Sequence, residues 1–279
     1  MKIYLLSLFA FLQIYAESVK PNIVIIMVDD IGWGGPSCFD NQYFKTPGID
    51  RMSLEGIKLT DFHTNGVVCT PTRAALMTGR YQQRSGCGVV INANPNNPDL
   101  DLGISDEEWT FAEAMKSTGY ATAIFGKWHL GYKPECHPMN HGFDEFVGFI
   151  SGNIDAQSHY NRMGIFDWWE GRELIYESGH HTDLITNRAI DFIERKKHQN
   201  FFLYVAYGTP HRPIQARGSK IQRGPHVGEI PGWAPRVEYD NEPGSDNWLI
   251  RHFTLPVDEG VDRILNKIVE VDIQKNTIV

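Results

Sequence analysis

The sequence lacks the features of a nucleic-acid-binding, zinc-binding or membrane-spanning protein. No long run of Lys or Arg is present, and the formal net charge is -8, from 34 acidic and 26 basic side chains. Nucleic-acid-binding proteins normally present a basic face, so we expect no nucleic-acid partner. The chain has only 4 cysteines, and none forms a CxxC pair of the kind that binds zinc.

The N-terminus predicts an export signal at residues 1–16. Lys2 precedes an almost wholly apolar stretch, and Ala16 gives a small residue at a cleavage point. The stretch is too short to span a bilayer, and no later segment could do so, so we expect no stable membrane insertion. We predict a periplasmic, secreted or lysosome-like location. In an oxidising compartment, the cysteines could form two disulfides in three possible pairings.

Short apolar runs alternate with helical patterns along the chain. Asn22–Val28, residues 121–125 and residues 201–206 are typical of strands buried on both faces, and residues 58–63 predict another strand. Helices are expected from a Thr46-Pro47 start to Gly56, over 71–79, from a Thr110/Glu113 capping box to Gly119, over 183–197 and over 258–270. The alternation predicts an α/β fold, with a mainly parallel sheet sandwiched by helices and a ligand site at the carboxyl ends of its strands.

The most specific pattern is Cys69-Thr70-Pro71-Thr72-Arg73. Pro71 can begin a helix, whose N-terminal N–H groups favour an anion, and Arg73 would lie in its first turn. A cysteine taken alone would more often be a buried structural residue. The spacing of the proline and the arginine therefore carries the functional interpretation.

Other polar residues follow the three predicted buried strands. Asp29 and Asp30 end the first, and adjacent carboxylates favour a hard divalent cation between them. Lys127 and His129 follow the second, two residues apart, so both can face one pocket if the segment stays extended. His211 follows the third, and histidine suits proton transfer near neutral pH. Taken alone, the Asp29-Asp30 pair would more often lie in a solvated loop. Lys127 alone would more often be a surface lysine, and His129 alone a core histidine.

Together these segments resemble the type I sulfatases of the alkaline phosphatase superfamily, through C-x-P-x-R at 69–73, G-K-W-H-x-G at 126–131 and the Asp29-Asp30 pair. The resemblance implies that Cys69 is oxidised to formylglycine, whose hydrated aldehyde attacks sulfur. Its second hydroxyl then loses a proton, and the covalent sulfate is released. A thiol or a serine would form a stable adduct, because neither has a second hydroxyl. The resemblance also implies Ca2+ as a cofactor.

The same resemblance implies a role for each site residue. The metal ligands would be Asp29, Asp30 and the modified Cys69. Arg73 would hold the diol oxygens, Lys127 would bind the sulfate, His129 would assist turnover of the covalent sulfate, and His211 would contact the sulfate and protonate the leaving alcohol. Asp155 or His159 could touch a sugar. We interpret Trp168-Trp169 as part of a hairpin with inward-facing aromatics, and His180-His181 as a loop before a helix.

The implied partners are a sulfated carbohydrate or aryl sulfate substrate and a formylglycine-generating or anaerobic sulfatase-maturating enzyme. Related sulfatases continue with an Asp-Asn pair, a further lysine and a smaller C-terminal domain. We therefore expect residues 17–279 to be the N-terminal part of the catalytic domain, poorly stable and nearly inactive alone. Two alternatives stay open: a phosphate or phosphonate monoester hydrolase of the same superfamily, and an inactive, truncated sulfatase-like protein that binds glycans.

Overall fold

The computed structural model describes residues 20–42, 44–225 and 245–279, with side chains from residue 254 onward in the last range. The predicted signal peptide at 1–16 lies outside these ranges. Within them, no helix has the length and apolar character that crossing a membrane requires.

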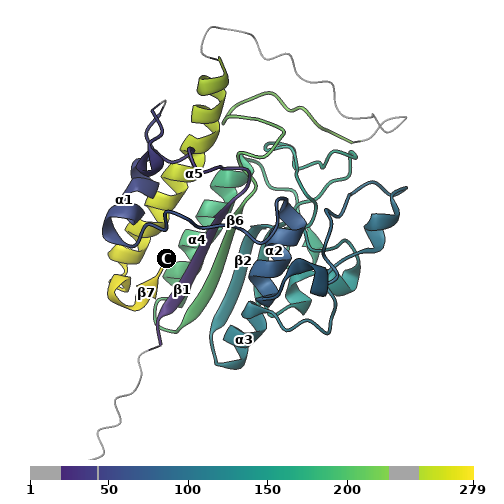
Figure 1. Cartoon of the computed structure of the whole chain (residues 1–279), viewed down its shortest axis with the longest axis horizontal. Helices are drawn as coiled ribbons and strands as arrows, with labels where there is room; N and C mark the ends of the chain where they lie inside the picture. Colours follow the sequence, from purple (N-terminus) through teal and green to yellow (C-terminus); the bar gives the residue numbers. More distant parts are fainter. Residues whose placement is uncertain (1–19, 43, 226–244) are drawn as a thin grey trace, which may run out of the picture.

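A seven-stranded sheet forms the centre of the protein, in the order β5-β4-β3-β2-β6-β1-β7. The strands are β1 (Asn22–Val28), β2 (Ala121–Lys127), β3 (Glu145–Phe149), β4 (Trp169–Glu170), β5 (Glu173–Leu174), β6 (Phe201–Tyr207) and β7 (Thr277–Ile278). Pairings among β1, β2, β3, β6 and β7 are parallel, and only the β4–β5 hairpin adds antiparallel pairs. The predicted α/β fold with a mainly parallel sheet is confirmed (Figure 1).

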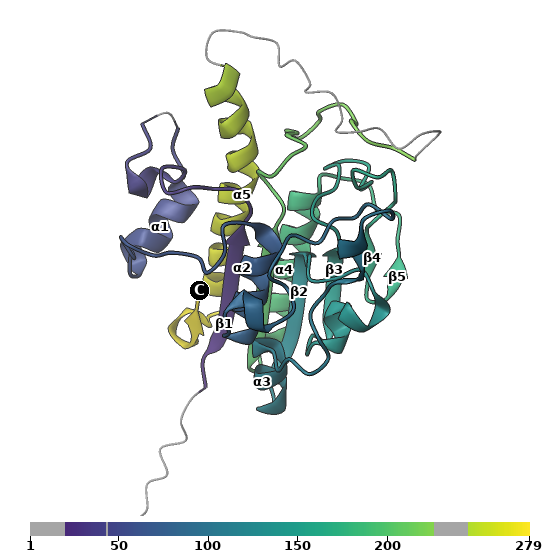
Figure 2. The same ribbon diagram turned by 45° about the vertical axis from the view of Figure 1, so that its right-hand side comes forward.

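Helices cover both faces of the sheet, as Figures 1 and 2 show. The α-helices are α1 (Pro47–Glu55), α2 (Cys69–Thr78), α3 (Phe111–Ser117), α4 (His181–Lys196) and α5 (Ser245–Glu270). Short 3-10 turns lie at Ser37–Phe39, Gln82–Arg84, Pro98–Asp101, Pro134–Cys136, Pro138–Asn140 and Gln274–Asn276. Apolar side chains of α4 and α5 pack on one face of the sheet, and those of α2 and α3 on the other.

The register of the parallel strands brings their carboxyl ends level. Ala206 of β6 pairs with Met27 of β1 on one side and with Gly126 of β2 on the other. Residues that directly follow β1 and β2 therefore meet at one edge of the sheet, above the end of β6. This edge holds the predicted site.

Most predicted elements are confirmed, with shifted ends. The Thr110/Glu113 capping box is present at the start of α3. Thr46 occupies the cap position of α1, but its side chain donates to Asp50 rather than accepting from the helix backbone. The first N–H groups of α1 are instead bound by the Asp258 carboxylate of α5, at 3.2 Å from Gly48 and 2.9 Å from Ile49.

Three predictions of secondary structure are wrong. Residues 58–63 form no strand, since they are exposed and pair with no neighbour among the described residues. Helix α5 begins at Ser245 and contains Pro256, so the predicted start at residue 258 is 13 residues late. Helix α2 begins at Cys69 rather than at Pro71, because Thr72 N–H already bonds the Val68 carbonyl. Strand β3 was not predicted.

The cysteines are all free thiols in this structure, so the two possible disulfides are not formed. The hairpin interpretation is confirmed: β4 and β5 pair around Gly171, and Trp168 is fully buried. His180 caps α4, and His181 is its first residue. This segment is therefore the helix start itself and not a loop before it.

Candidate functional site

Cys69 lies at the first position of α2, partly exposed, after an extended Val68. Side-chain bonds hold the turn that leads into the helix. The Thr72 hydroxyl donates to the Gly66 carbonyl at 2.8 Å, and the Thr70 hydroxyl accepts from Ile91 N–H at 3.3 Å. A side chain at position 66 would collide with Pro71. The cysteine is thus presented at a helix N-terminus, where free N–H groups favour an anion.

The Arg73 guanidinium is buried beneath this helix start, with 1% of the residue exposed. Its Nη1 donates to the Lys127 carbonyl at 2.8 Å and to the Tyr204 hydroxyl at 3.3 Å. Its Nε and Nη2 have no hydrogen-bond partner among the described residues. Buried donors are normally paired, so this guanidinium has capacity for an oxyanion.

Asp29 and Lys127 form a buried ion pair next to Arg73. Lys127 Nζ lies 2.5 Å from one Asp29 oxygen, and Arg73 Nη2 lies 3.6 Å from the other. Burial by itself would raise the pKa of Asp29, but the ammonium and the guanidinium together lower it to about 2. These three residues, called the cation cluster below, carry two positive charges and one negative charge. The excess positive charge is buried, and a bound anion would neutralise it.

His129 lies beside the cation cluster as a neutral imidazole. Burial, followed by the Lys127 charge, holds the pKa of His129 well below its usual value. The ring Nε2 lies 2.8 Å from the Ile91 carbonyl and so carries the proton that it donates there. Nδ1 is then an unprotonated acceptor, buried without a partner among the described residues. The ring can therefore accept a proton at Nδ1.

The chain reaches this geometry by a bend and not by an extended segment. His129 has φ 57° and Gly126 has φ 116°, so the expectation of a straight 127–129 segment is wrong. A side chain on Gly126 would lie 2.0 Å from the Ala206 carbonyl, which explains the glycine. The Lys127 and His129 side chains still converge on one site.

His211 follows β6 at the same edge. Its Nδ1 donates to the Arg212 carbonyl at 2.8 Å, and its Nε2 lies 3.8 Å from an Asp30 oxygen. Burial and the Lys127 charge lower the pKa of His211. Asp30 has φ 63° and a mostly exposed side chain.

Asp155 does not join this group. Its carboxylate is fully buried and accepts five hydrogen bonds. One comes from the Gln215 side chain, and four come from the backbone N–H groups of Gln157, Ser158, Gln222 and Arg223. These bonds anchor the 215–223 loop and leave no exposed oxygen for a sugar. His159 is likewise buried, stacked 4.6 Å from Trp168. Both side chains are bound within the protein in this structure, and their expected contact with a sugar stays a prediction.

The calcium expectation fits the described residues only in part. Asp29 and Asp30 supply carboxylates of the hard-oxygen type, but Ca2+ takes about six to eight oxygen ligands. No group of three or more His, Cys, Asp or Glu side chains suited to a metal occurs within the described ranges. One of the two carboxylates is also already paired with Lys127. We therefore derive no step through calcium.

Two contributors were not anticipated from sequence. The Tyr204 hydroxyl, inside β6, contacts Arg73, and the Ile91 carbonyl fixes the tautomer of His129. An alternating strand pattern could have placed Tyr204 on the α2 face. No sequence pattern points to a backbone carbonyl.

Comparisons with known proteins find the same family by sequence and by fold. The family model described as "Sulfatase" matches residues 21–279. Human N-acetylgalactosamine-6-sulfatase is 36% identical over 213 residues, which cover 70% of this chain and 40% of that protein. Human steryl-sulfatase is 40% identical over 167 residues, which cover 55% of this chain and 28% of that protein.

A solved structure, that of Ps i-CgsB, has a similar fold. It superposes with a TM-score of 0.76 at 26% identity, over 92% of this chain and 57% of that one. The chain thus spans about two-fifths to one-half the length of the N-acetylgalactosamine-6-sulfatases that it matches.

Proposed function

The chain belongs to the sulfatase family, and on that premise we propose that it hydrolyses aryl or carbohydrate sulfate esters at the cation cluster beside Cys69. One observation carries the proposal: a buried excess of positive charge, with unpaired guanidinium N–H groups, lies under a partly exposed cysteine at a helix N-terminus. A sulfate group supplies the anion and oxygen acceptors that this arrangement lacks.

Each residue can be given an action from its contacts. Arg73 Nε and Nη2 donate to oxygens at the reacting group, and Lys127 neutralises sulfate charge. His129 Nδ1 accepts a proton, since its Nε2 is committed to Ile91. His211, with a pKa below the usual range, is suited to exchange a proton with the leaving alcohol.

The two cofactors enter this proposal at named residues. Oxidised to formylglycine by a maturation enzyme, Cys69 would supply a hydrated aldehyde as nucleophile with a second hydroxyl to release sulfate. Asp29, Asp30 and the modified Cys69 would contribute oxygens to Ca2+. We also propose an exported location, which suits sulfated glycans and the predicted signal at 1–16.

Release of inorganic sulfate from 4-nitrophenyl sulfate tests the proposal, with 4-nitrophenyl phosphate measured in parallel. Cys69→Ser should abolish turnover, whereas Cys38→Ser, at another partly exposed cysteine, should leave it unchanged. Faster hydrolysis of the phosphate ester would instead favour a phosphate or phosphonate monoester hydrolase.

A binding protein without turnover is the second candidate, because the described residues supply only part of a calcium site. Sulfated-glycan binding that depends on Arg73 and Lys127, without any sulfate release, would support it. Arg73→Lys keeps the charge but removes the fork of donors, so it separates charge attraction from oxyanion recognition.

A further inference from the structure

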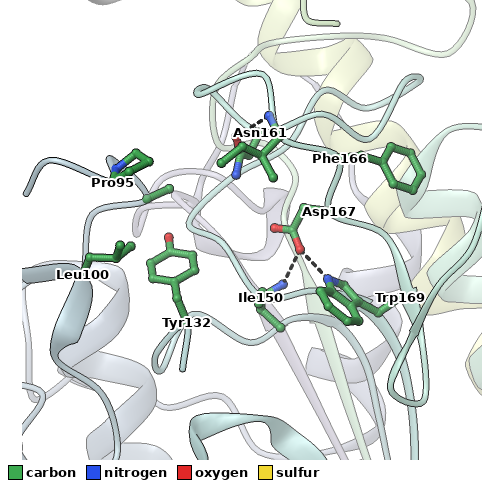
Figure 3. A pocket seen from close by; sticks show the side chains of 10 residues that line it. Pro95, Leu100, Tyr132, Ile150, Asn161, Phe166, Asp167 and Trp169 are labelled. Carbon is green, nitrogen blue, oxygen red and sulfur yellow. Dashed lines mark hydrogen bonds between the residues drawn. The ribbon is translucent and has the colours of Figure 1, made fainter. Parts of the chain in front are cut away.

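A pocket of about 180 Å³ lies beside the candidate site, between the 93–100 loop and the segments at 150 and 161–169. Figure 3 shows its lining side chains. Most of the wall is apolar, including Ala93, Ile150, Phe166 and Trp169. A cavity of about 150 Å³ with walls of this kind accepts a benzene ring.

Three of the chain segments that line the pocket also carry groups around His129. Ala93 is two residues from Ile91, whose carbonyl binds the His129 ring. Ile150 is two residues from Gly152, where a side chain would lie 2.7 Å from that ring. Tyr132 follows His129 by three residues and also lines the pocket. The pocket wall and the surroundings of the His129 ring are therefore built from the same three chain segments.

The pocket wall is held in place by Asp167. This buried carboxylate accepts from Ile150 N–H at 3.1 Å, from Ser151 N–H at 2.9 Å and from the Trp169 indole at 2.7 Å. Two of these bonds are drawn in Figure 3. Because the carboxylate fixes two lining residues at once, the pocket is formed before any ligand arrives.

Tyr132 supplies one polar group inside this apolar wall. Its hydroxyl is buried and donates to no acceptor among the described residues, and the nearest polar group is the Gly152 backbone. Figure 3 shows it pointing into the space between Pro95 and Asp167. Burial and the Asp167 charge raise the pKa of Tyr132, so the hydroxyl keeps its proton. A ligand oxygen would satisfy it.

We propose that this pocket seats an aromatic ring of the alcohol that carries the sulfate, with the Tyr132 hydroxyl bonded to an oxygen on that ring. The inference rests on the proposed function, because it names the substrate class of the same site. A pyranose fits less well, since its several hydroxyls would face a wall with few polar groups. Tyr132 and Ala93 are then specificity-determining residues for aryl sulfates.

Binding of phenol and of toluene to the full chain, followed by calorimetry, tests the pocket without any need for turnover. Ala93→Phe fills the pocket and should weaken both ligands about tenfold or more. Tyr132→Phe should weaken phenol about fivefold while leaving toluene unchanged, because only phenol can bond the hydroxyl. Tyr176→Phe, at an 83% exposed tyrosine, is the matched control. Circular dichroism checks that each variant is folded.

The outcomes separate this inference from the proposed function. Phenol binding that responds to both variants supports the pocket even where no sulfate ester is hydrolysed. Sulfate release without phenol binding, or with binding that neither variant changes, overturns the pocket and leaves the hydrolase standing. Binding of methyl β-galactoside in preference to phenol also overturns it.

Discussion

Lys127 Nζ lies 2.5 Å from Asp29 Oδ2, although the two residues end different strands with β6 between them. The level register of β1, β6 and β2 makes this contact possible. With Arg73 at 3.6 Å, one buried carboxylate holds two buried cations at the place where a substrate anion is expected. Asp29 therefore stabilises the buried positions of both cations, and one positive charge is left for a substrate anion.

Removing the Asp29 charge should destabilise the protein strongly. Asp29→Asn leaves Lys127 and Arg73 buried without their counterion, and we expect the free energy of unfolding to fall by about 3–5 kcal/mol. Asp30→Asn is the matched control, because that neighbouring carboxylate is mostly exposed and should change stability by about 0.5 kcal/mol or less. Urea denaturation measures both. Equal effects of the two substitutions would show that the cation cluster is not buried as described.

Gly152 fixes the position of the His129 ring. A methyl group there would lie 2.7 Å from the ring, so Gly152→Ala should displace the proposed proton acceptor. We expect kcat to fall about 100-fold, which is typical of a misplacement of about 1 Å. Gly224→Ala, where nothing lies within 4 Å, is the control. An unchanged kcat in folded Gly152→Ala protein would remove His129 from the mechanism.

Stability should decrease as the pH falls below neutrality. Burial, followed by the charges of Arg172 and His141, lowers the pKa of His137 to about 4. In an unfolded chain the pKa of histidine is about 6.5. Between these values the unfolded chain binds a proton that the folded chain does not. The free energy of unfolding should therefore fall by about 2 kcal/mol from pH 7 to pH 5 through His137 alone.

Urea denaturation at a series of pH values checks this expectation. His137→Asn should reduce the loss of stability between pH 7 and pH 5 by about 2 kcal/mol, whereas His198→Asn, at an exposed histidine, serves as the control. A free energy of unfolding that stays level or rises toward pH 5 would contradict the buried, neutral state of His137.

The buried parallel strands could be predicted from sequence because their apolar runs are continuous. Asn22–Val28 matches β1 at both ends, and the carboxyl-end rule then placed Asp29, Lys127 and His211 together. Residues 58–63 contain Leu59 and Phe62, which made them resemble a strand, yet both side chains are exposed. Local composition cannot show whether a partner strand is present.

The site could be predicted as a set of residues but not as a geometry. The left-handed backbone at His129 depends on packing against Gly152 and Ile91, which no local pattern encodes. Asp155 was expected at the substrate because residues 151–155 lie where related sulfatases place pocket residues. Its five donors come from loop segments up to 68 residues away. Such long-range bonds decide whether a carboxylate is structural or functional.

The most direct test of the account is the mass of the tryptic peptide containing Cys69, measured together with sulfate release, on protein made in its own host. Lys58 and Arg73 bound this peptide, residues 59–73. The account predicts a peptide about 18 Da lighter than the unmodified one, through conversion of the thiol to an aldehyde. It also predicts that the same protein releases sulfate from an aryl sulfate ester. A peptide that carries only the free thiol, from protein that releases no sulfate, would contradict the proposed hydrolase.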